Sequence, residues 1–488
     1  MAKPDALFLL IQSLSPGEKA AVRQGEKGQS GYLALFDLIA KQKTYDEAKA
    51  KKKLADAGHQ VNFSYAKNYL TKHILAVLRD NDDSGPNAGN TIVQDIEILI
   101  QRRIYDLAER MVTKAIERTL HEERWHDYLQ LSSMQLELIL HHSSDVEVTV
   151  QTIEDINQNR TLARQSMNIL GELEDLYFRH RPIIKHKLNA RHDMDLARID
   201  RLAAHPLMKD RDAISTSRAK RLQMLCESLV QTFRGQYAQS MDTLNELVLL
   251  YRNVKWLRND HPDSYLNDLW RLGGMKLHFG AYAEVEEILT EIEALYGSKG
   301  LHDSEIFEKH SRLLLGYALH TRNYTLANAK MPAIQQGLLS HSEMIPWTSL
   351  SMLLVWVARV HFEQQQYKEA KSWINHILDH PQRGQREDTV GLARLMLIFI
   401  YFETGESDLC ESQCKATRKF LQRRDSLHAF ERTILRFLEN HSFTDKNAQL
   451  IQAMKQLRTE LAEIFKNPLE ANFLAYFDIL RWLDTKTA

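Results

Sequence analysis

Two pairs of residues have the Ser-x-x-Lys spacing with which some enzymes combine a serine nucleophile and a lysine. They are Ser64 with Lys67 and Ser217 with Lys220. In penicillin-interacting enzymes this motif acts together with further motifs, and neither pair here has them or a strand pattern nearby. Two unrelated matches in one chain indicate chance. The patterns of phosphate loops, dinucleotide-binding folds, nucleophile elbows and metalloprotease helices are also missing from the sequence, so we expect no enzyme.

Potential metal ligands are spaced unfavourably. Cys410 and Cys414 lie one helical turn apart, but a soft metal ion needs two further ligands and none occurs at a suitable spacing. We interpret both thiols as small buried groups at a helix crossing. The regularly spaced histidines are His121 and His126, and His180, His186 and His192. Neither set converges on one point of a straight helix, so we expect no metal and no cofactor.

Basic residues gather in two segments. The first contains Lys41, Lys43, Lys49, Lys51, Lys52 and Lys53, and the second contains Arg179, Arg181, Lys185, Lys187 and Arg191. Segment 41–53 precedes a turn and a helix expected near Ser64, an arrangement that suits a nucleic-acid reader. Its lysines lie before that helix, however, so we interpret them as a solvated helix face. Segment 179–191 could dock an acidic partner, although nearby acidic residues favour a mixed-charge surface.

The elements that would position these groups are helices. Residues 346–378 show the clearest unit, two amphipathic helices joined by a corner at Gln365, Gln366 and Tyr367. Apolar residues recur at helical spacing on both sides of this corner. The chain has only 10 Pro and 19 Gly in 488 residues, which also favours helix over sheet.

The same corner recurs along the chain. Its reference positions are Tyr105, Tyr237, Tyr282, Tyr324, Tyr367 and Ser407. From Tyr237 onward they are 40 to 45 residues apart, and the first interval of 132 residues predicts hidden corners near Thr149 and Met194. A small residue three positions after most corners would let the second helix approach the first closely, with the tyrosine filling the wedge between them.

This corner resembles the middle of the tetratricopeptide repeat (TPR). The resemblance covers roughly residues 91–425, with a period longer than the usual 34 residues and Ser407 in place of the tyrosine. It implies an all-α fold, a right-handed α-solenoid of TPR-like helix-turn-helix units. The segment before it resembles a module of uncharacterised bacterial helical-repeat proteins, a likeness that implies no activity.

The sequence predicts four parts. They are a small N-terminal helical module over 1–80, a flexible linker over 81–90, TPR-like repeats over 91–425 and closing helices over 426–488 that cap the stack. Within the module, helix starts are expected at the capping boxes Ser15–Glu18 and Thr44–Glu47, and at Ser64. A long helix after residue 145 should end or restart at Pro182, and the last closing helix should cover residues 469–483.

In repeats of this kind the first helix of each unit lines a concave wall. Counting back from the corners places Trp270, His278, Arg312, His320, Arg359 and Glu363 on that wall. Their aromatic and cationic groups suit an acidic or aromatic peptide, with Arg312 and Arg359 clamping carboxylates. We therefore expect a scaffold or adaptor that binds a partner protein or peptide in this groove. The alternative is a transcriptional or signalling regulator whose basic N-terminal module contacts nucleic acid.

Charge and cysteine content indicate the surroundings of the protein. With 63 Lys and Arg against 64 Asp and Glu, the net charge of −1 draws the protein neither to nucleic acid nor to a membrane. The apolar run Ala6–Ile11 is too short for a signal peptide, and no run approaches the ~20 residues that span a bilayer. Three cysteines indicate a reducing compartment. We expect a cytoplasmic protein, with no small-molecule substrate evident.

Overall fold

The regular structure in the computed structural model is helical, with no strand among the residues that it describes, which confirms the all-α prediction. The structure describes residues 5–25, 30–42, 45–59, 62–80, 88–142, 145–186, 193–298, 300–441 and 448–487. Contacts divide the chain into two compact units, residues 1–167 and 168–488, and the division falls within one long helix. In the described ranges, no helix is both long and apolar enough to cross a bilayer.

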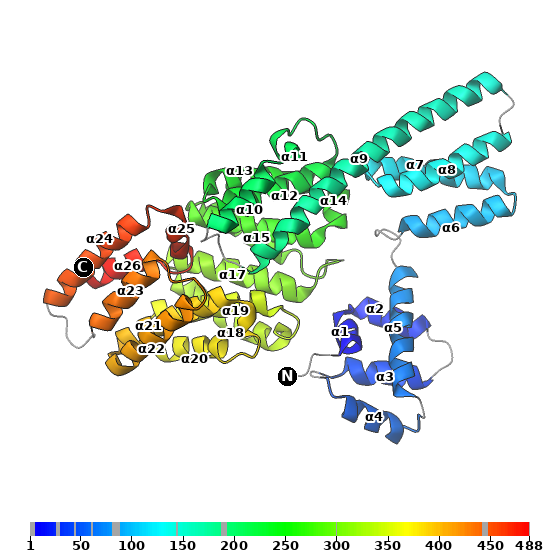
Figure 1. Cartoon of the computed structure of the whole chain (residues 1–488). Helices are drawn as coiled ribbons and strands as arrows, with labels where there is room; N and C mark the ends of the chain where they lie inside the picture. The colour runs from blue at the N-terminus through cyan, green and yellow to red at the C-terminus, as the bar shows by residue number, and fades with distance from the viewer. Residues whose placement is uncertain are drawn as a thin grey trace. The chain divides into compact units, whose positions relative to one another are not determined.

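The first part of the 1–167 unit has five helices around one apolar core (Figure 1). They are α1 (Ala6–Ser13), α2 (Pro16–Gly25), α3 (Ser30–Ala40), α4 (Glu47–Asp56) and α5 (Phe63–Asp80). Phe36, Ile39, Leu70 and Ile74 are fully buried in this core. Because α1, α2 and α3 all contact α5, the last helix holds the group together.

Local hydrogen bonds explain where these helices start. At α2 the predicted capping box is present, since Ser15 N donates to Glu18 Oε2 at 2.8 Å and Glu18 N donates to Ser15 Oγ at 3.3 Å. The other two predicted starts differ. Asp46 caps α4 by accepting from Lys49 N at 2.8 Å, and Asn62 stands before α5 in place of Ser64. Thr44 lies outside the described residues.

Four further helices complete this unit with a second apolar core. They are α6 (Ala88–Gln101), α7 (Tyr105–His121), α8 (Trp125–His142) and the first half of α9 (Val146–His186). Ile96, Val112, Leu131 and Ala163 are at most 1% exposed there. Of the predicted linker, residues 81–87 lie outside the described ranges, and α6 begins at Ala88.

One continuous core runs through the 168–488 unit. Its later elements are α10 (Asp193–Ala203), α11 (Pro206–Lys209), α12 (Ser217–Phe233), α13 (Tyr237–Asn253), α14 (Lys255–Asp260), α15 (Pro262–His278), α16 (Tyr282–Glu293), α17 (Asp303–Thr321), α18 (Tyr324–His341), α19 (Trp347–Glu363), α20 (Tyr367–Leu378), η1 (Arg383–Gln385), α21 (Glu387–Thr404), α22 (Ser407–Gln422), α23 (Ala429–Asn440), α24 (Ala448–Ile464), α25 (Pro468–Ala471), η2 (Asn472–Ala475) and α26 (Ile479–Thr487). Helices α13, α15, α17, α19 and α21 each contact the next in that series, and most also contact the helices between them.

Each of the six reference residues of the predicted corners, from Tyr105 to Ser407, is the first residue of a helix. The residue two positions earlier has a positive φ in every case: Arg103, Gly235, Gly280, Arg322, Gln365 and Gly405. The residue in between donates its N–H to the carbonyl five residues back, as in a Schellman motif, for example Gln366 N to His361 O at 2.9 Å. Glu123 has the same conformation two residues before α8 begins at Trp125. The sequence analysis missed this corner, because tryptophan takes the place of tyrosine.

The residues three positions after the corners, which are small except for Val285, lie between closely packed helices. They are Ala108, Ser240, Val285, Ala327, Ala370 and Cys410, each at most 3% exposed. Ser240 illustrates the spacing: its Oγ lies 3.0 Å from the carbonyl oxygen of Ser228 on the preceding helix. A larger side chain at this position would separate the two helices.

The corner tyrosines were predicted to fill the wedge within one helix pair, but they also contact the next helix pair. Tyr237, the first residue of α13, packs edge-on against His278 at the end of α15, with ring centroids 5.1 Å apart. Tyr367 donates its hydroxyl to Glu403 Oε2 at 3.1 Å, which connects α20 to α21. These contacts tie one helix pair to the next, because each tyrosine reaches the far end of the following helix.

Helix α9 departs from the predicted pattern. The expected corner near Thr149 lies inside α9, and this helix continues through Pro182 to His186. Pro182 is near the end of the helix, so it removes one hydrogen bond where few turns remain to be disrupted. Met194 is the second residue of α10, close to the other expected corner, but the residues directly before α10 lie outside the described ranges.

Replacing a small residue after a corner tests the close packing. Ala327 on α18 is 1% exposed, so Ala327→Leu should lower the free energy of unfolding by about 1–3 kcal/mol. Ala329→Leu on the exposed face of the same helix should change it by less than about 0.5 kcal/mol. Urea unfolding followed by circular dichroism measures both variants. Equal losses would contradict the packing role of Ala327.

Candidate partner-binding surface

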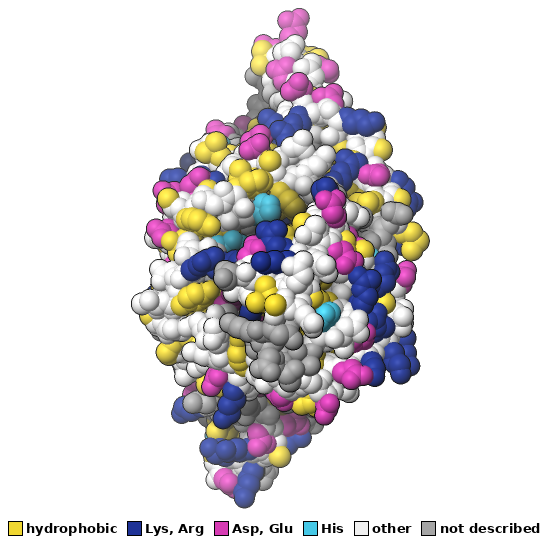
Figure 2. Space-filling view, turned by 90° about the vertical axis from the view of Figure 1, so that its left-hand side faces the viewer, with side chains coloured by type: hydrophobic (Ala, Val, Ile, Leu, Met, Phe, Trp, Pro, Cys, Tyr) yellow, Lys and Arg dark blue, Asp and Glu magenta, His cyan; other side chains and the backbone are white. Residues whose placement is uncertain are grey.

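The six residues predicted to line the wall lie on three successive helices. Trp270 and His278 are on α15, Arg312 and His320 are on α17, and Arg359 and Glu363 are on α19. Helix α17 contacts both α15 and α19, so the three helices form one continuous layer. Figure 2 shows a face of the molecule on which Lys, Arg and His side chains lie near its middle, interspersed with acidic and hydrophobic groups.

Trp270 and Arg312 meet in a cationic cluster. The guanidinium carbon of Arg312 lies 4.4 Å from the Trp270 ring centroid, and Lys309 Nζ lies 4.9 Å from it. Both cations also bind Glu308, Arg312 Nη1 at 2.6 Å and Lys309 Nζ at 2.8 Å. Glu308 neutralises one of the two positive charges, so the cluster presents a net charge of about +1 beside an aromatic ring.

Glu308 is the buried anchor of this cluster, with a side chain that is 2% exposed. Burial alone would raise the pKa of the carboxyl group. The positive charges of Lys309 and Arg312 and their hydrogen bonds outweigh that effect and lower the pKa to about 2. Glu308 therefore stays ionised at neutral pH and fixes the direction of both cationic side chains.

Arg359 binds the chain itself. It is 4% exposed, and its Nη1 donates to the carbonyl oxygen of Tyr476 at 2.9 Å. Its Nε lies 3.8 Å from Glu363 Oε1, the other predicted residue on α19. Burial lowers the pKa of Arg359, while the negative charge of Glu363 acts in the opposite direction. The structure thus brings Arg359 and Glu363 together, with the guanidinium turned toward the C-terminal part of the chain.

The two predicted histidines are uncharged neighbours of these groups. His278 is exposed at the end of α15, against the ring of Tyr237. His320 Nδ1 lies 2.8 Å from the carbonyl oxygen of Gly316. Burial lowers the pKa of His320, and the charge of Arg359 adds to this effect while the contact with Gly316 opposes it. At neutral pH His320 is therefore a neutral hydrogen-bonding group.

Residues 470–487, here termed the C-terminal segment, lie against α19 and α21. The ring centroid of Phe477 is 5.6 Å from that of Phe362 on α19 and 5.0 Å from that of Phe399 on α21. Phe477 is 1% exposed. The segment therefore covers part of the layer whose other parts carry Trp270 and Arg312.

Glu403 fixes the end of the C-terminal segment. Its side chain is 4% exposed and accepts hydrogen bonds from Trp482 Nε1 at 2.7 Å and Lys486 Nζ at 2.6 Å. Tyr367 completes the set from the corner of α20. A buried carboxylate with three donors is satisfied without water, so this contact is a specific one.

The predicted helix over residues 469–483 is interrupted. The short helix α25 is followed by η2, and α26 starts only after Asp478, whose Oδ1 accepts a hydrogen bond from Arg481 N at 3.1 Å. The interruption turns the backbone so that Tyr476 offers its carbonyl to Arg359. Sequence reasoning missed Tyr476, Phe477 and Glu403 as binding residues. The sequence feature that could have indicated a buried segment is the density of aromatic residues from Phe473 to Trp482, which is high for a helix with one face in water.

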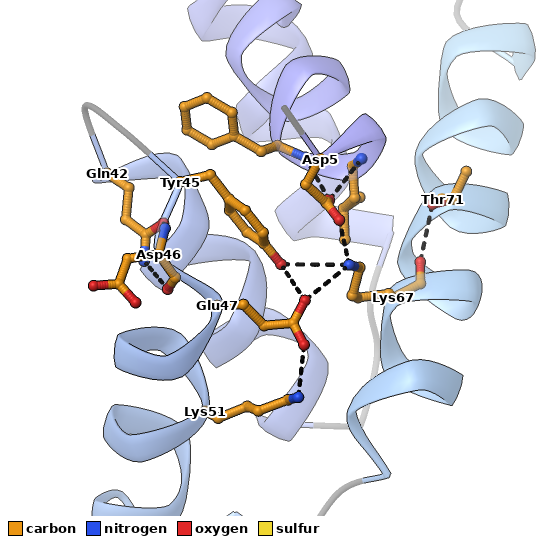
Figure 3. Close-up of polar contacts among 10 residues, drawn as sticks. Asp5, Gln42, Tyr45, Asp46, Glu47, Lys51, Lys67 and Thr71 are labelled. Atoms are coloured by element: carbon orange, nitrogen blue, oxygen red, sulfur yellow. Dashed lines mark hydrogen bonds and ion pairs between the residues drawn. The ribbon is translucent and has the colours of Figure 1, made fainter. Parts of the chain in front are cut away.

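The Ser-x-x-Lys pair in the first unit belongs to a structural cluster. Lys67 Nζ binds Asp5 and lies 3.4 Å from both the Tyr45 hydroxyl and Glu47 Oε2 (Figure 3). Burial alone would lower the pKa of Lys67, but its hydrogen bonds to Asp5 and Tyr45 raise it above its usual value. A lysine that stays protonated cannot act as the base that a serine nucleophile needs. Ser64 itself is exposed to solvent.

The basic segments and the thiols have ordinary surroundings where they are described. Lys49, Lys51, Lys52 and Lys53 are exposed on α4, and Lys51 pairs with Glu47 at 2.6 Å. Lys41 is also exposed, Lys43 is outside the described residues, and of segment 179–191 only the side chain of Arg179 is described. Cys226, Cys410 and Cys414 are buried free thiols. Across the described ranges, no three His, Cys, Asp or Glu residues gather as metal ligands would.

Acid titration tests the anchoring role of Glu308. Its lowered pKa adds stability that is complete above the unfolded pKa and is lost as the pH falls toward about 2. The difference in unfolding free energy between wild type and Glu308→Gln should therefore shrink by about 2 kcal/mol from about pH 6 to about pH 3. Glu305→Gln on the same helix should show the opposite trend, because burial raises the pKa of Glu305. A constant difference for Glu308→Gln in urea titrations would refute the assignment.

No protein-family model matches the chain, and no curated protein matches it either. Any statement about function therefore rests on the contacts described above.

Proposed function

We propose that this protein is a cytoplasmic scaffold or adaptor, a right-handed solenoid of TPR-like helix pairs that holds a partner protein or peptide. The repeated Schellman corners and the contacts between successive first helices support this architecture. In such an arrangement the first helices α15, α17 and α19 share one inner face. The partner would bind along this face, beside the C-terminal segment.

The observation that carries the proposal is the binding of the C-terminal segment to α19 and α21. Arg359 binds a main-chain carbonyl of this segment, Phe477 enters an aromatic pocket and Glu403 accepts two side-chain donors. These are the contacts that peptide-binding grooves use, with main-chain hydrogen bonds for affinity and side-chain pockets for specificity. The layer of first helices can therefore hold an irregular peptide segment.

The part of the layer on α15 and α17 suits an acidic partner. Trp270 offers an aromatic face, and Lys309 and Arg312 lie above it, with Glu308 bound to both cations. His278 is exposed at the end of the same helix. A carboxylate of the partner would bind the excess positive charge, while an apolar side chain could pack on the indole.

Site-directed photo-crosslinking tests this function. A photoreactive amino acid at His278 should form a covalent product with one main partner in extracts of the source organism, because this position is exposed on a first helix. The matched control is the same amino acid at Leu339, which is 80% exposed on the second helix α18. Mass spectrometry identifies the products. A partner captured at Leu339 and absent at His278 would place the binding surface elsewhere.

The alternative is a regulator whose N-terminal module contacts nucleic acid, favoured by the four exposed lysines of α4. These lysines precede α5 instead of lining it, and Lys51 is already paired. We expect duplex DNA to bind no tighter than roughly 10⁻⁴ M at physiological salt, the weak end of non-specific binding. Fluorescence anisotropy at several salt concentrations measures this. A tighter, salt-dependent complex lost in Lys51→Glu with Lys52→Glu would favour the regulator.

A further inference from the structure

A recess opens where α20 ends, α21 begins and α22 ends. Its volume is about 320 Å³, and its lining includes Arg383, Gly384, Glu387, Arg394, Phe420 and Arg424. A Cβ added at Gly384 would meet no atom within 4 Å, so the rim is open at this point. The size is at the lower end of small-molecule sites, which span about 300–1,000 Å³.

Positive charge in this recess exceeds negative charge. Three arginines line it against the single carboxylate of Glu387, which Arg424 Nε binds at 2.8 Å. Neither Arg383 nor Arg394 forms an ion pair with a described residue. The Nε of Arg394 is buried and has no hydrogen-bond partner in the described part of the chain. An unsatisfied buried donor on a cation is costly, and an anion in the recess would offset this cost by balancing the charge of the guanidinium.

Phe420 holds two of the arginines in place. The guanidinium carbon of Arg424 lies 4.0 Å from the Phe420 ring centroid, and that of Arg394 lies 4.8 Å from it. Burial lowers the pKa of Arg394, and the positive charges of Arg424 and Arg383 act in the same direction. The cations are thus held close together in spite of their repulsion, a geometry that is stabilised by a bound anion.

We propose that this recess binds the phosphate group of a small phosphorylated molecule. Three arginines and one glutamate give a net charge of about +2, which matches the charge of −1.5 to −2 on a phosphate monoester at neutral pH. Guanidinium groups bind phosphate oxygens through paired N–H donors. The site is separate from the layer on α15 and α17, and the sequence offered no sign of it because its residues come from η1, α21 and the end of α22.

Phosphate titration of the full-length protein tests the proposal. Inorganic phosphate and glycerol phosphate, followed by calorimetry and phosphorus NMR, should bind in competition with each other at constant ionic strength. Acetate should bind more weakly, because it carries one charge. Binding should strengthen as the pH rises through about 6, where phosphate takes its second charge. Glycerol phosphate tests whether the recess binds a small phosphorylated molecule, and a phosphoserine peptide tests whether it binds a phosphorylated protein.

Substitutions locate the binding. Arg394→Gln should weaken phosphate binding about tenfold or more, since it removes the unpaired guanidinium. Arg423→Gln, an exposed arginine at the end of α22 outside the recess, should leave it nearly unchanged. Arg383→Gln should also weaken phosphate binding. Because Arg383 is exposed on a turn, this loss cannot be attributed to misfolding. Absence of phosphate binding, equal binding by Arg394→Gln and Arg423→Gln, or much tighter binding of the phosphoserine peptide would overturn the proposal.

Discussion

The close approach of two antiparallel helices at each corner is the constraint on which the larger unit depends. A residue with positive φ ends one helix, and the next helix begins two residues later. Non-glycine residues at this position, such as Arg322 and Gln365, pay about 1–2 kcal/mol for a left-handed conformation. The Schellman hydrogen bond offsets part of this cost within the first helix, and the burial of the small residue that follows adds stability once the second helix packs against the first.

Buried charges then decide how the layer of first helices is used. The side chains of Glu308, Arg359 and Glu403 are all at most 5% exposed, and an unpaired charge at such a depth would be strongly destabilising. Their partners differ. Glu308 binds cations of its own helix, whereas Arg359 pairs with Glu363 and also binds the C-terminal segment, as Glu403 does. One part of the layer is therefore completed by the chain, and the part around Trp270 keeps an excess of positive charge.

The cluster around Lys67 shows how a motif can have the right spacing without the chemistry. Ser64 and Lys67 match a catalytic pattern in the sequence. In the fold Lys67 joins Asp5, Tyr45 and Glu47, which come from two other parts of the module, the starts of α1 and α4. Carboxylates around an ammonium group stabilise its charged form, so the lysine links helices and remains protonated. The basic recess beside Phe420 is the reverse case, a site with no sequence motif.

The sequence by itself determined the helical class, the six corners and the helices that carry the predicted wall residues. It could do so because helical periodicity, small residues and corner residues are local properties. It did not reveal the corner at Trp125, the continuation of α9 through Pro182, or the contacts of Arg312 with Trp270 and of Arg359 with Tyr476. Only the tertiary structure decided those contacts. Arg359 meets Tyr476 across 117 positions of sequence, and a contact at such a separation depends on how every intervening helix packs.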